Sequence, residues 1–230
     1  MLILLHGRGI LILTNGPGHT VRVALFGATG PLGRRILDEL LERGHEVNVL
    51  VGDPTKLARE SEKITVVRGD TEDPEKVDEV ITGCEAVIDS LGVRSNTEAE
   101  VKRLIGVTEL ILATMRRQGV PRFIGVAGAA VDVPGDKKGT GYVLAAWLSK
   151  LTARHVVEEK QKEFEIVSRS GLDWTVIRVP FITEGESTGR YRASLTGPPS
   201  SRISRADIAY VLVSQLQDRR FIRKAPFIGS

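Results

Sequence analysis

Cysteine is nearly absent from this chain of 230 residues, because Cys84 is its only one. An internal disulfide is therefore excluded, and a chain without disulfides suits the reducing cytoplasm, where we expect this protein. Cys84 follows Gly83 at an expected helix end and precedes an apolar run. We therefore expect it to be a small buried residue and not a nucleophile.

A strong excess of charge of one sign is also missing. The sequence has 32 basic and 29 acidic residues, for a formal net charge of +3. This surplus is spread along the chain and does not indicate a nucleic-acid partner. We expect a small-molecule partner, no metal site, and a protein that is either a monomer or a homodimer.

Long hydrophobic runs are absent as well. A membrane span needs roughly 20 apolar residues, and the apolar stretches within residues 1–20 are interrupted by Arg8 and by glycines. They also lack the basic start and the cleavage site of a signal peptide. Residues 1–20 are either a short β-hairpin or an added extension, and we assign them no function. Residues 21–230 are expected to form one domain, since their number suits a single α/β unit.

The most informative stretch that is present runs from Val21 to Arg34. An apolar run, 21–26, leads into a turn with Gly27, Gly30 and Gly33, and leucines at helical spacing follow. Strand, glycine turn and helix together hold a dinucleotide pyrophosphate, because the backbone approaches the phosphates and the helix N-terminus attracts them. Pro31 suits the first helical turn, where its missing N–H has no partner to lose. The candidate phosphate-binding residues are Gly27, Thr29, Gly30, Pro31, Leu32, Gly33 and Arg34.

The rest of the chain alternates between expected strands and helices. Strands are expected at 45–51, 64–67, 86–90, 122–127 and 174–178. Helices are expected at 54–60, 73–83, 97–118 and 205–217, and one more long helix is expected between the polar loop at 135–141 and about residue 169. This alternation predicts an α/β fold with a doubly wound parallel sheet, in which the carboxyl ends of the strands meet at one edge. Residues 184–230 break the alternation, with short strands expected at 189–195 and 201–203 before the helix at 205–217.

The glycine spacing Gly27-Ala-Thr-Gly-Pro-Leu-Gly33 resembles the opening of the atypical short-chain dehydrogenase/reductase superfamily, in its NmrA-like and flavin-reductase-like branch. The resemblance covers the chain from about residue 21 to the C-terminus. It implies a Rossmann-like fold that binds NAD or NADP, with residues 184–206 as a small lobe on the substrate side. It also implies cofactor contacts at the end of each strand. These are Gly69 and Asp70 beside the adenine, Ser90, Leu91 and Gly92 at the nicotinamide ribose, Ala127 and Gly128, and Pro180 and Phe181 in the loop after Arg178.

The residues after the second strand decide between NAD and NADP. Some of them favour NAD and others favour NADP. Asp53 lies twenty residues after Gly33, as a ribose-binding acid would, but it equally suits a cap on the following turn. The family's frequent arginine before this aspartate is replaced by Gly52. Arg34 and Lys56 remain as groups that would hold a 2′-phosphate, and we lean slightly to NADP.

The superfamily's usual proton donor is missing. The resemblance places Gly128 where the family has a serine, and Val156 where it has the tyrosine of Tyr-x-x-x-Lys, while Lys160 is retained. Lys160 is therefore a catalytic and cofactor-binding candidate, and Tyr142 is a substitute proton donor of lower rank. Glu158 and Glu159 are expected on a solvated helix face.

Two functions remain. One is an NAD(P)H-dependent oxidoreductase that reduces a flavin, a quinone or a similar acceptor, which takes its proton from solvent and so needs neither serine nor tyrosine. The other is a catalytically idle dinucleotide sensor of the NmrA-like kind. A sugar-nucleotide epimerase is disfavoured, since such enzymes resemble the full Tyr-x-x-x-Lys type.

Overall fold

The structure is a computed structural model, and it describes residues 19–137 and 154–230. The expected extension at 1–20 therefore lies outside the described residues, apart from its last two. Tyr142 also lies outside them, and so do the side chains of 154–156.

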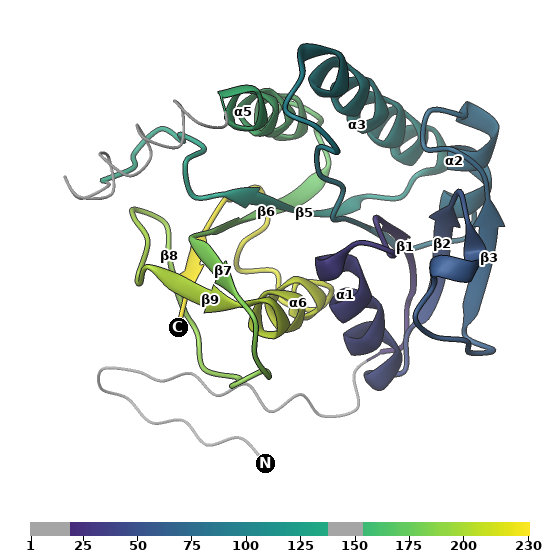
Figure 1. The fold of residues 1–230 in the computed structure, drawn as a ribbon, viewed down its shortest axis with the longest axis horizontal. Helices are drawn as coiled ribbons and strands as arrows, with labels where there is room; N and C mark the ends of the chain where they lie inside the picture. The colour runs from purple at the N-terminus through teal and green to yellow at the C-terminus, as the bar shows by residue number, and fades with distance from the viewer. Residues whose placement is uncertain (1–18, 138–153) are drawn as a thin grey trace.

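One large sheet forms the centre of the molecule (Figure 1). Its strand order is β3-β2-β1-β4-β5-β6-β10-β8, and all neighbours are parallel except β10 and β8. The strands are β1 (Arg22–Phe26), β2 (Glu46–Val51), β3 (Ile64–Arg68), β4 (Ala86–Asp89), β5 (Arg122–Gly128), β6 (Asp173–Val179), β8 (Arg192–Ser194) and β10 (Phe227–Gly229). The order reverses between β1 and β4, and the crevice at such a reversal is where doubly wound sheets bind ligands.

Helices cover both faces of the sheet, which confirms the predicted doubly wound fold (Figure 1). On one face lie α2 (Pro74–Ile81), α3 (Glu98–Gln118) and α5 (Arg154–Ser168), and on the other α1 (Pro31–Glu42) and α6 (Arg205–Ser214). Each face has its own apolar core, with Ile111 and Phe123 in one and Ile36 and Ile208 in the other. Cys84 is buried in the first core, as expected.

The helix ends follow the capping signals in the sequence. Asp73, Thr97 and Ser204 each accept a backbone N–H of the first turn of α2, α3 and α6. Such caps satisfy N–H groups that the helix itself leaves free. Gly44, just after α1, takes a left-handed φ of +84°, as expected of a glycine that ends a helix.

The C-terminal part joins the main sheet more closely than a separate lobe would. β8 pairs with β10 at the sheet edge, while β7 (Phe181–Thr183) and β9 (Arg202–Ser204) form a second, two-stranded sheet. The short strand expected at 201–203 is β9. Neither β7 nor β10 is expected from the sequence, and the helix expected to reach 217 ends at Ser214.

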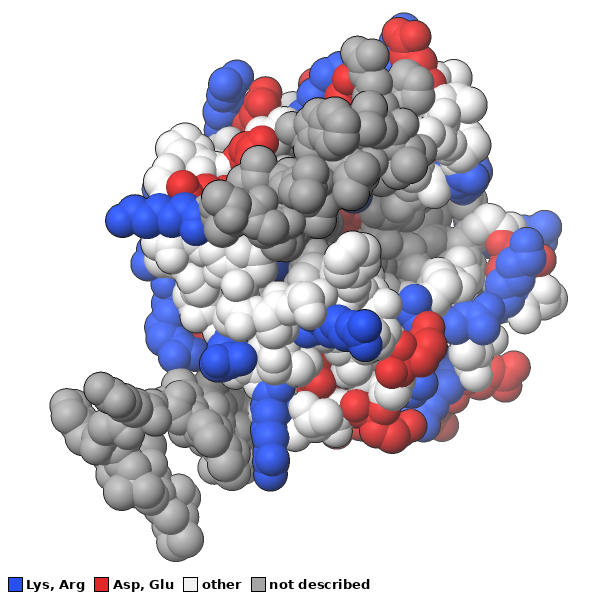
Figure 2. All heavy atoms as spheres, turned by 60° about the vertical axis from the view of Figure 1, so that its left-hand side comes forward, with Lys and Arg blue, Asp and Glu red and all other residues white. Residues whose placement is uncertain are grey.

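Figure 2 shows the molecule from the side on which β7, β8 and β9 lie. Uncharged surface occupies the middle of this face, and basic and acidic side chains alternate around it. Phe181, Ile182 and Leu195 are the exposed large apolar residues of this C-terminal region. None of the described helices has the length and hydrophobicity needed to span a bilayer.

Candidate functional site

The glycine turn joins the end of β1 to the start of α1. Gly27 has a left-handed φ of +82°, and its carbonyl oxygen accepts a hydrogen bond from the Gly30 N–H at 2.9 Å. Gly30 is the N-cap of α1 and has no side chain to cap the helix, Pro31 follows it, and the first turn holds no acidic residue. The free N–H groups and the helix dipole at this end therefore suit an anion.

Each of the three glycines is needed for a different reason. A Cβ on Gly33 would lie 1.9 Å from the Gly27 carbonyl oxygen, so the turn itself excludes any side chain there. A Cβ on Gly27 would lie 2.7 Å from Ser90 Oγ. At Gly30 the nearest atom, again the Gly27 carbonyl oxygen, would be 3.3 Å away, which is tight but needs only a small shift of that carbonyl. Of the three glycines, Gly30 is therefore the one that the packing of the protein constrains least.

The ends of β1 and β4 are tied together beside this turn. The Ser90 hydroxyl donates to the Phe26 carbonyl at 2.8 Å, and the Ser90 N–H donates to the same oxygen. Leu91 and the exposed Gly92 follow, and a Cβ on Gly92 would meet nothing within 4 Å. The structure thus brings the predicted residues after β4 next to the glycine turn and leaves space in front of them.

Two cations lie beside the turn, Arg34 from α1 and Lys56 from the segment that follows β2. Arg34 donates from Nε to the Thr29 carbonyl at 3.0 Å and from Nη2 to the Lys56 carbonyl at 3.4 Å. Lys56 Nζ lies 3.8 Å from Asp53 Oδ2, and both side chains are largely exposed. The guanidinium of Arg34 therefore bridges the glycine turn and the segment after β2.

Asp53 serves as a cap in this structure. Its Oδ1 accepts hydrogen bonds from the backbone N–H and from the hydroxyl of Thr55, at 3.1 and 2.7 Å. These bonds hold the pKa of the Asp53 carboxyl below its usual value. They also fix the start of the 3₁₀ turn η1 (Pro54–Lys56). The capping interpretation of Asp53 is thus confirmed.

The end of β3 forms a turn that leads into α2. Asp70 Oδ1 accepts from the Glu72 N–H at 3.0 Å, and the Asp73 N–H donates to the Asp70 carbonyl. Gly69 packs tightly, since a Cβ there would lie 2.5 Å from Cγ of Lys76. The predicted Gly69–Asp70 pair therefore stands at the same sheet edge as the glycine turn.

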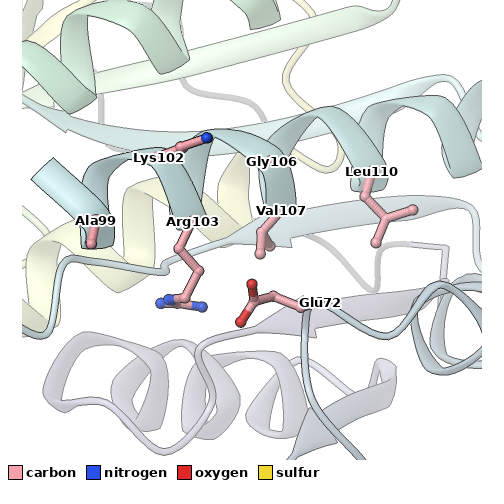
Figure 3. Close-up of a pocket in the computed structure, with 7 residues that line it drawn as sticks. All are labelled: Glu72, Ala99, Lys102, Arg103, Gly106, Val107 and Leu110. Carbon is pink, nitrogen blue, oxygen red and sulfur yellow. The ribbon is translucent and has the colours of Figure 1, made fainter.

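A pocket of about 490 Å³ opens beside this turn, between Glu72 and α3 (Figure 3). The Arg103 guanidinium and the Glu72 carboxylate point toward each other across it. Arg103 binds Glu100 through Nε and Nη2, while its Nη1 is buried and has no partner. The hydrogen bonds from Arg103 hold the pKa of Glu100 down at about 2. Arg103 is not among the residues predicted from the sequence, since one basic residue on a charged helix carries no distinguishing pattern.

The side chain of Lys160, from α5, reaches the end of β4, next to Ser90 and Leu91. Its Nζ donates to the Leu91 carbonyl at 3.1 Å and binds Glu163, and it lies 3.6 Å from Glu159 Oε1. Burial disfavours the charged form of Lys160, but the three carboxyl groups of Glu163, Glu159 and Asp89 outweigh it and raise its pKa. Lys160 is therefore a fixed cation beside Leu91.

The expectation for Glu159 was wrong. Its side chain is 1% exposed and faces the sheet, and burial raises its pKa to about 8. Glu163, one helical turn further, is buried as well, together with Val167. The spacing 159, 163, 167 places all three residues on one face of α5, and this is the signal that would have found them.

Arg178 has a structural role. It is 0% exposed, it binds both oxygens of Asp136 at 2.6 and 2.9 Å, and it donates to the Ala225 carbonyl. Its guanidinium also stacks 3.6 Å from the centre of the Phe227 ring. Arg178 thus holds the end of β6 against a carboxylate. Beyond it, Pro180 is half-buried, and Phe181 is 71% exposed.

The end of β5 carries only small residues without polar side chains, Ala127 and Gly128. Ala127 is buried, and Gly128 is exposed, with nothing within 4 Å of a Cβ placed on it. No hydroxyl therefore stands at this position, where the family has its serine. Within the part of the chain that the structure describes, no three acidic, histidine or cysteine side chains are arranged to hold a metal ion.

Comparison with known proteins agrees with this geometry. Residues 27–219 match the model of a family described as NAD(P)H-binding. A protein of Arabidopsis thaliana, described as chloroplastic and uncharacterized, is 31% identical over 178 residues, which are 74% of this chain and 62% of that protein. A 3-beta-hydroxysteroid dehydrogenase of Mycolicibacterium neoaurum is 32% identical over 124 residues, or 50% of this chain and 34% of that enzyme. The chain thus matches less than two thirds of either relative.

Among solved structures, a short-chain dehydrogenase/reductase of Veillonella parvula in complex with NADP has a similar fold. The TM-score is 0.74 at 17% identity, and the match covers 92% of this chain and 95% of that one. At this identity the likeness concerns the fold alone.

Proposed function

This chain belongs to the NAD(P)H-binding family, and we propose that it is an NAD(P)H-dependent oxidoreductase of the atypical short-chain dehydrogenase/reductase type. The observation that carries the proposal is the convergence of three parts at one sheet edge. These are the uncapped N-terminus of α1, the open strand end at Ser90–Gly92, and Lys160 bound to the Leu91 carbonyl.

The pyrophosphate would lie at Gly30, because this glycine is the N-cap of α1, has no side chain to cap the helix, and stands at its positive end. The adenine would lie toward Gly69 and Asp70, beside the pocket that Arg103 and Glu72 line. The nicotinamide ribose would lie against Ser90–Gly92, where Lys160 is within reach. The bound cofactor supplies hydride transfer from the nicotinamide ring.

We favour NADP over NAD. Arg34 of α1 reaches the segment after β2 that carries Lys56, and these two cationic groups would pair with a 2′-phosphate. Asp53, the candidate for binding an unphosphorylated ribose, uses its Oδ1 to cap the turn at Thr55. Two cations next to one another at this position favour the phosphorylated cofactor.

The acceptor we propose is a flavin, a quinone or a similar ring. Gly128 offers no hydroxyl to polarise a carbonyl, so a substrate that needs a proton donor at that point is poorly served. Ready electron acceptors need orientation more than acid catalysis. The exposed Phe181 and Ile182 on β7 would supply an apolar wall for such a ring.

The single, buried thiol of Cys84 suits a reducing compartment such as the cytoplasm.

The test is oxidation of bound cofactor. Purified protein is mixed with NADPH or NADH, and then with FMN or a short-chain quinone, while the absorbance of the reduced nicotinamide is followed. Loss of that absorbance at a rate proportional to protein concentration is the expected result. Tight binding with no oxidation by any acceptor would favour the second candidate, a dinucleotide sensor, which the missing serine and tyrosine equally allow.

A further inference from the structure

Three carboxyl groups surround one ammonium group in the interior behind the β4 end. Asp89 is the last residue of β4, and Glu159 and Glu163 come from α5 together with Lys160. Asp89, Glu159 and Glu163 are 4%, 1% and 8% exposed. We call these four residues the carboxyl cluster. It takes no part in the cofactor contacts described above, apart from Lys160.

The charges of this cluster do not balance. If all three carboxyl groups were ionised, a single ammonium would face three negative charges, which a buried site disfavours strongly. One oxygen of Glu159, Oε2, is buried and has no hydrogen-bond partner, so this carboxyl group is incompletely compensated. Burial, and then the neighbouring carboxyl groups, raise the pKa of Glu159 to about 8 and that of Asp89 to about 7. At neutral pH the cluster therefore retains a proton.

The described charged groups on the elements that pack against α5, which are α3, β5 and β6, bind partners outside the cluster or are exposed. Arg103 binds Glu100, Arg178 binds Asp136, and Asp173 binds Arg219. Arg122 donates to the backbone carbonyls of Gln215 and Asp173. On α3, Lys102, Glu109, Arg116 and Arg117 are exposed. Among the residues that the structure describes, the groups that act on Glu159 are Lys160, Glu163 and Asp89, so the proton belongs to the cluster as a unit.

The cluster is joined directly to the predicted nicotinamide end of the site. Asp89 Oδ1 accepts from the Leu91 N–H at 2.9 Å, and Lys160 Nζ donates to the Leu91 carbonyl at 3.1 Å. The N–H and the C=O of Leu91 are thus both held by cluster members. A charge that appears on a nicotinamide in front of Leu91 would act on the cluster through a short and poorly hydrated path.

We propose that the carboxyl cluster distinguishes oxidised from reduced dinucleotide by giving up its proton when the oxidised form binds and keeping it when the reduced form binds. This inference rests on the proposed function, because it needs the nicotinamide at Ser90–Gly92. The oxidised ring carries a positive charge and the reduced ring is neutral, whereas the phosphates are the same in both. Only the oxidised ring stabilises the ionised cluster, so only its binding releases a proton.

The sign of the pH dependence follows from linkage. The free protein holds the proton up to about pH 7 to 8, and the bound oxidised cofactor lowers that limit. Between the two limits the affinity for NADP⁺ rises with pH, approaching about tenfold per pH unit for one released proton. The affinity for NADPH stays nearly constant over the same range.

Calorimetry tests this without any turnover. NADP⁺ and NADPH are titrated into the full chain at about pH 7.5, in phosphate and in Tris, whose ionisation enthalpies differ. The expected result is a binding heat that depends on the buffer for NADP⁺ and not for NADPH. Equal proton exchange with both forms, or none with either, overturns the inference while leaving the proposed function intact. No binding of either form overturns the proposed function and this inference with it.

Variants locate the proton. Glu159→Gln removes one titrating group at nearly constant shape, so NADP⁺ binding should lose its proton release and its pH dependence while NADPH binding is unchanged. Asp89→Asn is a second variant with the same expectation, in case the first does not fold. Glu165→Gln, on the exposed side of α5, is the matched control and should behave as the wild type. Unaltered proton release in both Glu159→Gln and Asp89→Asn would contradict the proposal.

Discussion

The carbonyl oxygen of Gly27 fills the space that a side chain at Gly33 would need. An ideal Cβ on Gly33 would lie 1.9 Å from it, whereas one on Gly30 would lie 3.3 Å away. The two glycines therefore serve different ends. Gly33 lets α1 pack onto the strand–turn backbone, and Gly30 leaves the helix N-terminus open.

Substitutions at these two positions should separate stability from binding. Gly33→Ala is expected to lower the free energy of unfolding by on the order of 3 kcal/mol, because the backbone must shift to admit a methyl group. Gly30→Ala should cost about 1 kcal/mol or less, since the neighbouring carbonyl has only to move slightly. Chemical denaturation measures both. Equal losses in the two variants would contradict the assignment of Gly33 to packing.

Lys160→Met should weaken NADPH binding about tenfold, the effect of losing one charged hydrogen bond. The side chain would no longer reach the cofactor ribose or hold the Leu91 peptide. Lys162→Met, two residues further on the exposed side of α5, is the control and should bind normally. Fluorescence titration of NADPH gives both dissociation constants. A normal value for Lys160→Met would place the ribose elsewhere.

The cofactor preference should depend on Arg34. Arg34→Met is expected to weaken NADPH binding about tenfold or more and to leave NADH binding nearly unchanged, because only NADPH has a 2′-phosphate to pair with. Arg35→Met is the neighbouring control. If instead both cofactors lose affinity equally, Arg34 acts by holding the Thr29 and Lys56 carbonyls and not by reading the phosphate.

The buried pair of Arg178 and Asp136 should matter for stability. Asp136→Ala leaves the fully buried guanidinium without its carboxylate, and the free energy of unfolding should fall by about 3 kcal/mol. Arg219→Met breaks an exposed ion pair with Asp173 and should change it by less than about 1 kcal/mol. Urea denaturation compares the two. A loss at Asp136 no larger than that at Arg219 would contradict the structural role of Arg178.

Much of the fold could be predicted from the sequence because its signals are local. Apolar runs, glycine turns and capping residues such as Asp73 and Thr97 lie within a few residues of the elements they define. β7 and β10 were missed because each has three residues and depends on pairing with a distant partner. Their formation is decided by tertiary contacts and leaves no periodic pattern.

In the candidate site, too, the features with a local sequence signal could be predicted, and those that depend on tertiary packing could not. The glycine turn and the strand ends were predictable because the topology brings strand termini to one edge. The burial of Glu159 was not predicted, since two adjacent glutamates on a charged helix are typical of a solvated face. The spacing of Glu159, Glu163 and Val167 marks them as one face of α5, but that this face is buried is decided by the packing of α5 on α3, β5 and β6.

The central claim is that a dinucleotide binds at Gly30. The most direct measurement is a fluorescence titration of NADPH and NADH into the wild type and into Gly30→Val, with the thermal unfolding of both proteins recorded alongside. We expect saturable binding to the wild type, and at least about tenfold weaker binding to a folded Gly30→Val, because a branched side chain would occupy the phosphate position. Equal affinity for the two folded proteins would contradict it.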